Sequence, residues 1–207
     1  ALKNIGMGSG SRAGKMEMHC DGKPSVNQDL CIGCGACSKI CAHDAPQIKD
    51  KKAAINHDKC VGCGRCLAVC PKDAIAADFG DSVAVLNYKM AEYSLAVCKD
   101  RPCFHISLIC DVSPNCDCHS ENDIPIIPNV GMLASSDPVA LDQACADLCN
   151  KMEPVKDSIL GENREKHHDD TEHDHFYMTH PDTEWKSCIA HAVKIGLGTD
   201  QYELVKI

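Results

Sequence analysis

The stretch 26-VNQDLCIGCGACSKIC-41 recurs without gaps as 55-INHDKCVGCGRCLAVC-70, a shift of 29 residues along the chain. Each copy carries four cysteines at the spacing C-x2-C-x2-C-x3-C, which is typical of iron–sulfur proteins because two-residue gaps let a backbone wrap three corners of a [4Fe–4S] cube. Each copy predicts a short strand, a glycine-rich turn and a short helical turn. Residues 47–55, between the copies, predict two short strands joined by a turn.

The fourth ligand of each cluster is expected to come from the other copy. In two-cluster ferredoxins, the last cysteine of each run ligates the neighbouring cluster. The pattern therefore assigns cluster I to Cys31, Cys34, Cys37 and Cys70, and cluster II to Cys60, Cys63, Cys66 and Cys41. Zinc knuckles are the alternative, and they are disfavoured because zinc sites use separated C-x-x-C pairs rather than three cysteines in one run. We expect two [4Fe–4S] clusters in a bacterial ferredoxin-like module at residues 24–79.

The residue after the last cysteine differs between the copies: Pro71 follows Cys70, whereas Ala42 follows Cys41. Proline here fixes the backbone and removes an N–H group, but it is not a ligand. We therefore expect Ala42 to leave cluster II in place and to add a backbone donor that changes its potential modestly. Neighbouring acidic residues favour low potentials, namely Asp44, Asp50, Asp58, Asp73 and Asp78.

The composition excludes several classes of function. The chain has 207 residues, a formal charge of −9 and a pI near 5.6, so it lacks the basic surface that a nucleic-acid partner requires. It contains no run of 18 apolar residues, so no membrane span is predicted, and it shows no signal peptide. Its seventeen cysteines therefore indicate reduced thiols in the cytoplasm rather than a disulfide framework.

The module separates an N-terminal piece at residues 1–23 from a longer segment at residues 80–207. In the first piece, GMGSGSRAGK (6–15) fails the phosphate-loop pattern and predicts a structural turn. The longer segment predicts a helix over 85–99, a buried strand over 104–112, a strand over 124–135, a helix capped by Asp137 and begun by Pro138, a loop over 161–184 and a helix over 185–198. We expect an α+β fold in which the module interrupts an α/β domain.

A further group of potential metal ligands lies in 110-CDVSPNCDCH-119. A third metal site is proposed there, with the ligands Cys116, Cys118, His119 and Cys110. The alternative is that these are incidental loop residues, because C-x-C is shorter than the usual zinc spacing. The run 167-HHDDTEHDH-175 predicts a solvated loop that binds metal weakly. Cys145 and Cys149 share the apolar face of the helix after Pro138 and are expected to fill the core.

Three segments outside the module point together to one family: KNIGMGSGSRAGKMEMH (3–19), CDVSPNCDCH (110–119) and GMLASSDPVALDQA (131–144). They resemble the iron–sulfur branch of the family called domain of unknown function 362. The resemblance implies a ferredoxin-like insert in an α/β domain and a redox-linked role. Members of that branch carry a further N-terminal region, so the resemblance also implies that this chain is a fragment, a cleaved product or one half of a split protein.

We expect an iron–sulfur electron-transfer protein or subunit that relays low-potential electrons through its two clusters to a redox partner protein. The alternative is a redox enzyme whose site near Cys116, Cys118 and His119 receives electrons from the clusters, although no catalytic residue is identified. A third reading gives the clusters a structural or sensing role. The sequence leaves open the donor, the acceptor, the potentials, the oligomeric state, and whether a larger complex or a separate N-terminal chain completes the protein.

Overall fold

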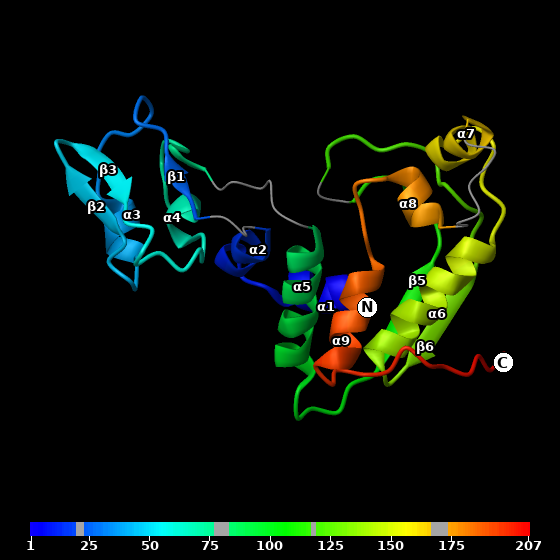
Figure 1. The fold of residues 1–207 in the computed structure, drawn as a ribbon. Helices are drawn as coiled ribbons and strands as arrows, with labels where there is room; N and C mark the ends of the chain where they lie inside the picture. The colour runs from blue at the N-terminus through cyan, green and yellow to red at the C-terminus, as the bar shows by residue number, and fades with distance from the viewer. Residues whose placement is uncertain (20–22, 77–82, 117–118, 167–173) are drawn as a thin grey trace.

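The computed structural model describes residues 1–19, 23–76, 83–116, 119–166 and 174–207 (Figure 1). These residues form helices and three antiparallel sheets of two strands each, which is an α+β architecture. The larger α/β layer expected for the segment after residue 80 is not formed by the described residues, whose strands there make a single pair. None of the described helices is long and apolar enough to cross a membrane.

The two copies of the repeat form matching elements. Strand β1 (Ser25–Val26) and helix α3 (Ala36–Ile40) belong to the first copy, and helix α4 (Arg65–Ala68) belongs to the second, which strand β4 (Ile75–Ala76) follows. Between the helices lies a hairpin of β2 (Pro46–Lys49) and β3 (Lys52–Ile55), which confirms the strand–turn–strand prediction for 47–55. The hairpin turns at Asp50 and Lys51, whose φ values of 50° and 59° are those of a two-residue type I′ turn.

Strand pairing connects the two copies crosswise. Strand β1, at the start of the first copy, pairs with β4, which follows the second copy, and Val26 lies opposite Ile75. Strand β3, which leads into the second copy, pairs with β2, which follows the first copy, and Ile55 lies opposite Pro46. This pseudo-twofold arrangement brings the end of each copy beside the start of the other, and Ala53 and Ile75 pack in the core between them.

Four helices pack against one another next to the repeat, with α2 nearest to it: α1 (Leu2–Ser9), α2 (Arg12–His19), α5 (Val83–Cys98) and α9 (Lys186–Lys194). Helices α5 and α9 confirm the predictions for 85–99 and 185–198. The structural turn expected at 6–15 is wrong in part, because α1 and α2 occupy this segment except for Gly10 and Ser11, which join them. A Cβ atom on Gly6 would collide with the carbonyl oxygen of Met90, so close packing of α1 on α5 fixes a helix where glycine propensity disfavours one.

The third pair of strands lies against helix α6 (Pro138–Lys151). The side chain of Asp137 accepts hydrogen bonds from the amides of Val139 and Ala140, which confirms the predicted cap. Strand β5 (His105–Ile109) pairs with β6 (Gly131–Ser135). The strand predicted over 124–135 therefore begins seven residues later. The buried strand predicted over 104–112 is buried on one face only, because Ile106 and Leu108 are exposed.

The loop predicted over 161–184 is also wrong in part. Helix α7 (Ile159–Lys166) precedes residues 167–173, which lie outside the described residues, and helix α8 (His175–Thr179) follows them. Asp174 caps α8 by accepting hydrogen bonds from the amides of Phe176 and Tyr177. Leu160 at the start of α7 is fully buried in the core with Ile127 and Cys149, and this tertiary packing explains a helix within a polar run.

Candidate functional site

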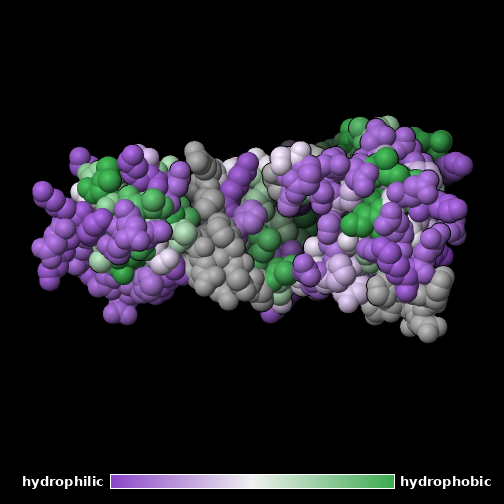
Figure 2. All heavy atoms as spheres, turned by 90° about the horizontal axis from the view of Figure 1, so that it is seen from above, coloured by the Kyte–Doolittle hydropathy of each residue, from purple (hydrophilic) through white to green (hydrophobic). Residues whose placement is uncertain are grey.

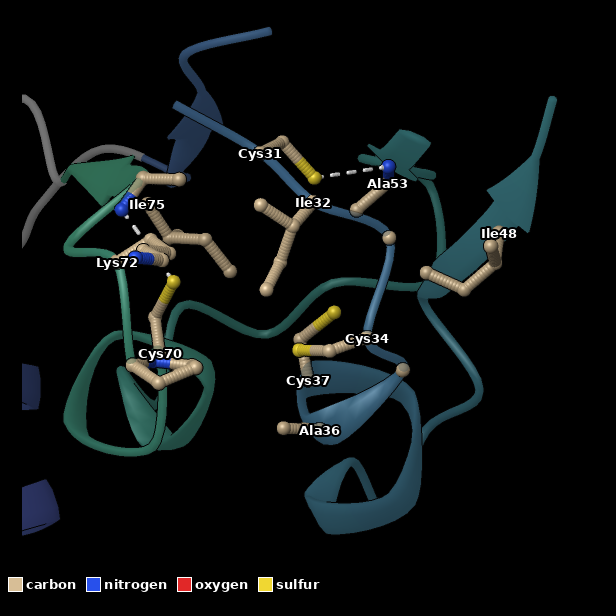
Figure 3. Close-up of a pocket in the computed structure, with 14 residues that line it drawn as sticks. Cys31, Ile32, Cys34, Ala36, Cys37, Ile48, Ala53, Cys70, Lys72 and Ile75 are labelled. Atoms are coloured by element: carbon tan, nitrogen blue, oxygen red, sulfur yellow. Dashed lines mark hydrogen bonds between the residues drawn. The ribbon is translucent and has the colours of Figure 1, made fainter. Parts of the chain in front are cut away.

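The first candidate site is a cavity between the two copies of the repeat. Its lining includes Cys31, Cys34, Cys37 and Cys70. Three of these cysteines come from the first copy and the fourth comes from the second. Figure 3 shows their sulfur atoms around the same space, with Ile32 among them.

A second cavity repeats this arrangement with the copies exchanged. Its lining includes Cys60, Cys63, Cys66 and Cys41. The crosswise strand pairing explains this composition, because it carries the last cysteine of each copy to the loop of the other. The structure therefore sorts the eight repeat cysteines into two groups of four, each with three from one copy and one from the other.

The loops that present the first three cysteines depend on backbone conformations that favour glycine. Gly33 has a φ of 63°, and a Cβ atom there would collide with the backbone of Lys51 in the hairpin turn. Gly35 has a φ of 78° and caps helix α3, which turns Cys37 inward to an exposure of 6%. The glycines thus allow the loop to approach both the hairpin and the cavity closely.

Backbone amides donate to several of the cavity sulfurs. Ala53 donates to the Sγ of Cys31 and Ala74 donates to the Sγ of Cys70, each over 3.3 Å. The hydrogen bonds from Ala53 and then Gly33 lower the pKa of the Cys31 thiol, with a further contribution from Lys52, and they outweigh the opposing effect of burial. Such donors stabilise the thiolate form that binds metal.

The amide that donates to Cys41 is that of His43, over 3.4 Å. The sequence predicted an added donor from Ala42, the residue that replaces proline. The observed donor is instead one residue further along. At the first cysteine of the second copy, the amide of Gly62 donates to the Sγ of Cys60 over the same length of 3.4 Å.

For two other cavity cysteines, burial outweighs the hydrogen bonds that oppose it. Burial raises the pKa of Cys66 to about 11, with a further contribution from the charge of Cys60, and burial also raises the pKa of Cys37. A buried thiolate is costly unless a cation neutralises it. These two cysteines therefore suit a site in which bound metal supplies the positive charge.

Lysines, rather than acids, make the closest charged contacts to these loops. The Nζ of Lys52 donates to the carbonyl oxygens of Gln28 and Cys31 over 2.5 and 2.7 Å. At the equivalent position, 29 residues earlier, the Nζ of Lys23 donates to the carbonyl oxygen of His57. The acidic surroundings predicted from the sequence are therefore only part of the local field, because cationic side chains lie against both cysteine loops.

The sulfurs in each cavity are too widely spaced for one metal ion. A zinc ion holds thiolates at about 2.3 Å, so its ligands lie within roughly 4.6 Å of one another. In the described part of the chain, which includes all eight repeat cysteines, no three of their sulfurs lie within 4.8 Å of one another. The repeat cysteines are consequently not arranged as a site for a single zinc ion.

The third site predicted from the sequence is not assembled by the residues that can be described. Cys110 is exposed, the Nζ of Lys3 donates to the Sγ of Cys116 over 2.7 Å, and the Nδ1 of His119 lies 3.3 Å from a carboxylate oxygen of Glu121. These three do not form a metal-binding group by themselves. Cys118 lies outside the described residues, so the four-ligand site remains a prediction.

Other predicted residues have structural roles. Cys149 is buried in the core and Cys145 packs against it, which confirms the prediction for this pair. His175, placed in a solvated loop by the sequence, is buried instead, and its Nε2 lies 2.8 Å from the carbonyl oxygen of Met152. The histidines at 167, 168 and 173 lie outside the described residues.

One Cys/Cys/His group was missed from the sequence. The ligand atoms of Cys98, Cys103 and His105 all lie within 4.8 Å of one another, close enough to hold a metal ion. The spacing C-x4-C-x-H is a signal that could have found it, but the three residues cross the boundary between a helix and a strand.

Comparison with known proteins places the chain in one family. No curated protein matches it. Residues 1–147 match the family described as "Domain of unknown function (DUF362)", a match that covers the repeat, helix α5, the β5–β6 pair and most of α6. The chain therefore belongs to the domain of unknown function 362 family.

Proposed function

We propose that the protein is an iron–sulfur electron-transfer protein or subunit, with one [4Fe–4S] cluster in each cysteine cavity. A ferredoxin-like module at residues 24–79, inserted between residues 1–23 and 80–207, would hold both. The first cluster takes Cys31, Cys34, Cys37 and Cys70, and the second takes Cys60, Cys63, Cys66 and Cys41.

The observation that carries this proposal is the sorting of eight sulfurs into two cavities. Each cavity offers four thiols at separations beyond the reach of one zinc ion. Exchange of the last cysteine between two C-x2-C-x2-C-x3-C runs is the ligand pattern of two-cluster ferredoxins. Zinc sites, the alternative, do not use three cysteines from one run together with a fourth from another run.

The residues of each cavity would bind the cluster, shield it from water and adjust its reduction potential. The amides of Ala53 and Ala74 donate to ligand sulfurs, and such hydrogen bonds raise the reduction potential of a cluster. Cys37 and Cys66 are exposed by only 6% and 9%, so water has little access to the inner side of either cavity. When bound, each cluster accepts and donates one electron at a time.

An exposed apolar side chain beside each cavity offers a docking point for a redox partner protein. Ile32 and Val61 follow the first cysteine of each copy, line the two cavities, and are exposed by 56% and 59%. Figure 2 shows hydrophobic side chains interspersed with hydrophilic ones on the module, at the left end of the view. A partner that covers such a side chain would bring its own redox centre near the cluster without crossing a thick layer of protein.

The low potential and the cytoplasmic location remain parts of the proposal. The described residues contain no disulfide, as expected in a reducing compartment. Carboxylates around the repeat favour a low potential, whereas Lys23 and Lys52 oppose it. Reduction potentials of protein-bound clusters span roughly −700 to +450 mV, and a redox titration measures where the potentials of these two clusters lie in that range.

The test pairs cysteine variants and follows them by anaerobic redox titration with electron paramagnetic resonance. We expect the wild-type chain to show two reversible one-electron centres. Cys34→Ala and Cys70→Ala should disturb the same centre, whereas Cys63→Ala and Cys41→Ala should disturb the other. Cys110→Ala, an exposed cysteine outside both cavities, is the control and should change neither. Grouping of Cys70→Ala with Cys63→Ala, or the absence of reversible centres, would overturn the proposal.

A further inference from the structure

A second kind of metal site is formed where helix α5 ends and strand β5 begins. Cys98 is the last residue of α5, His105 is the first residue of β5, and Cys103 lies in the short connection between them. Their ligand atoms lie within 4.8 Å of one another, and all three residues are half-buried. Figure 1 shows this connection at the end of α5 remote from the repeat module.

The imidazole of His105 lacks a partner at one nitrogen. Its Nε2 is buried and has no hydrogen-bond partner among the described residues. A buried polar atom left in this state costs roughly 1–3 kcal/mol, and buried polar atoms in native proteins are nearly always satisfied. A metal ion at the centre of the group would satisfy this nitrogen.

The connection holds the two cysteines close together. The amide of Arg101 donates to the carbonyl oxygen of Cys98 over 3.2 Å, and the Nη1 of Arg101 donates to the carbonyl oxygen of Val97 over 2.9 Å. Asp100 has a φ of 59°, which reverses the chain, and Pro102 restricts it further. The hydrogen bonds of Arg101 and the chain reversal at Asp100 therefore shape the connection that carries Cys103 back toward Cys98.

The thiols themselves make only weak contacts. The Sγ of Cys103 lies 3.5 Å from the carbonyl oxygen of Arg101 and 3.9 Å from that of Cys98. Burial, and then the hydrogen bond with Cys103, raise the pKa of Cys98, with Arg101 opposing the shift. Strong hydrogen bonds would compete with metal, so these loosely held thiols remain available as ligands.

We propose that Cys98, Cys103 and His105 bind one zinc ion through two thiolates and the Nε2 of the imidazole. Thiolate and imidazole ligands together favour zinc among the common divalent metals. The ligand separation is close to the roughly 4.6 Å limit of a single zinc shell, in contrast to the wider spacing in the two cysteine cavities. Water completes the fourth position, because the site is half-buried, and the ion ties the end of α5 to the start of β5.

The experiment measures zinc and iron together in the full chain purified without oxygen and incubated with Zn²⁺. We expect about one zinc per chain in the wild type, and its loss in the double variant Cys98→Ala/Cys103→Ala with iron content unchanged. Cys145→Ala, a half-buried cysteine outside the group, is the matched control and should keep its zinc. Because iron is counted separately, failure of the zinc site and failure of the electron-transfer proposal give different results.

Three outcomes would overturn the zinc site: no bound zinc in the wild type, zinc that persists in the double variant, or a Cys98–Cys103 disulfide found by mass spectrometry of the alkylated protein. A second measurement covers the case in which the double variant does not fold. Co²⁺ added to the wild-type chain after mild chelation should give the visible absorption of a tetrahedral thiolate site. His105→Ala should alter that spectrum, and an absence of the bands in the wild type contradicts the site.

Discussion

Asn27 donates its backbone N–H to the carbonyl oxygen of Ala74 over 2.7 Å, which joins the start of the first copy to the end of the second. The equivalent bond, 29 residues on, runs from Asn56 to Ala45 over 2.8 Å. Because these bonds cross between the copies, Cys70 lies at the cavity of the first loop. The exchange of the last cysteine is therefore a consequence of strand pairing.

The first prediction compares two glycines at equivalent positions. Gly33 and Gly62 both have positive φ, at 63° and 75°, so alanine costs roughly 1–2 kcal/mol at either. A Cβ atom on Gly33 also collides with the backbone of Lys51, whereas one on Gly62 meets no atom within 4 Å. Gly33→Ala should therefore lower iron content and unfolding midpoint more than Gly62→Ala. Equal losses in the two variants would show that the collision with the hairpin is unimportant.

The second prediction concerns the charge beside the first cavity. The Nζ of Lys52 lies 2.7 Å from the carbonyl oxygen of Cys31, and a nearby cation favours the reduced, more negative state of a bound cluster. Lys52→Met should lower the reduction potential of that cluster alone, as followed by redox titration. Lys49→Met, on the exposed strand β2, is the control and should have a smaller effect. A potential that rises or stays unchanged in Lys52→Met argues against the proposed position of the cluster.

The third prediction concerns the start of α6. Asp137 accepts from the amides of Val139 and Ala140 with Oδ1, over 2.8 and 3.0 Å, and from the amide of Thr199 with Oδ2, over 2.9 Å. Asp137→Ala should cost about 1–2 kcal/mol in the free energy of unfolding, measured with urea, because it removes a helix cap and a contact to the C-terminal segment. The exposed Asp182→Ala should stay within about 0.5 kcal/mol of the wild type. Similar values for both variants would refute the capping role.

The fourth prediction uses pH. Burial raises the pKa of Asp174, but hydrogen bonds from Trp185, Tyr177 and Lys186 outweigh it, and the net effect lowers this pKa below its ordinary 3.8. A lowered folded-state pKa gives stability that is fully present above pH 3.8 and is lost as the pH falls through the folded value. Asp174→Asn should therefore cost on the order of 1–2 kcal/mol near neutral pH and progressively less below pH 3.8.

The single tryptophan provides the readout for this test. The Nε1 of Trp185 donates to the Oδ2 of Asp174 over 2.9 Å, so its fluorescence reports the contact while urea unfolding reports the stability. Asp157→Asn, an exposed carboxylate, is the control and should show no pH-dependent difference from the wild type. The prediction is contradicted if the loss of unfolding free energy in Asp174→Asn, relative to the wild type, becomes larger as the pH falls.

The repeat could be predicted because its information is local. Cysteine spacing, glycine placement and the 29-residue period all lie within short windows, and Asp137 followed by Pro138 marks a helix start in the same way. Helices α1 and α7 were missed because tertiary contacts decide them: Gly6 packs on α5, and Leu160 fills a core formed by distant residues. The Cys98, Cys103 and His105 group was missed for a similar reason, since only the folded connection brings its ligands together.

The most direct test of the central claim is anaerobic analysis of iron and acid-labile sulfide in the purified chain. Two [4Fe–4S] clusters predict about eight iron atoms and about eight sulfides per chain, with both values reduced to about half in Cys70→Ala. About four of each in the wild type, or zinc in place of iron at the eight repeat cysteines, would contradict the proposal that this protein carries two clusters.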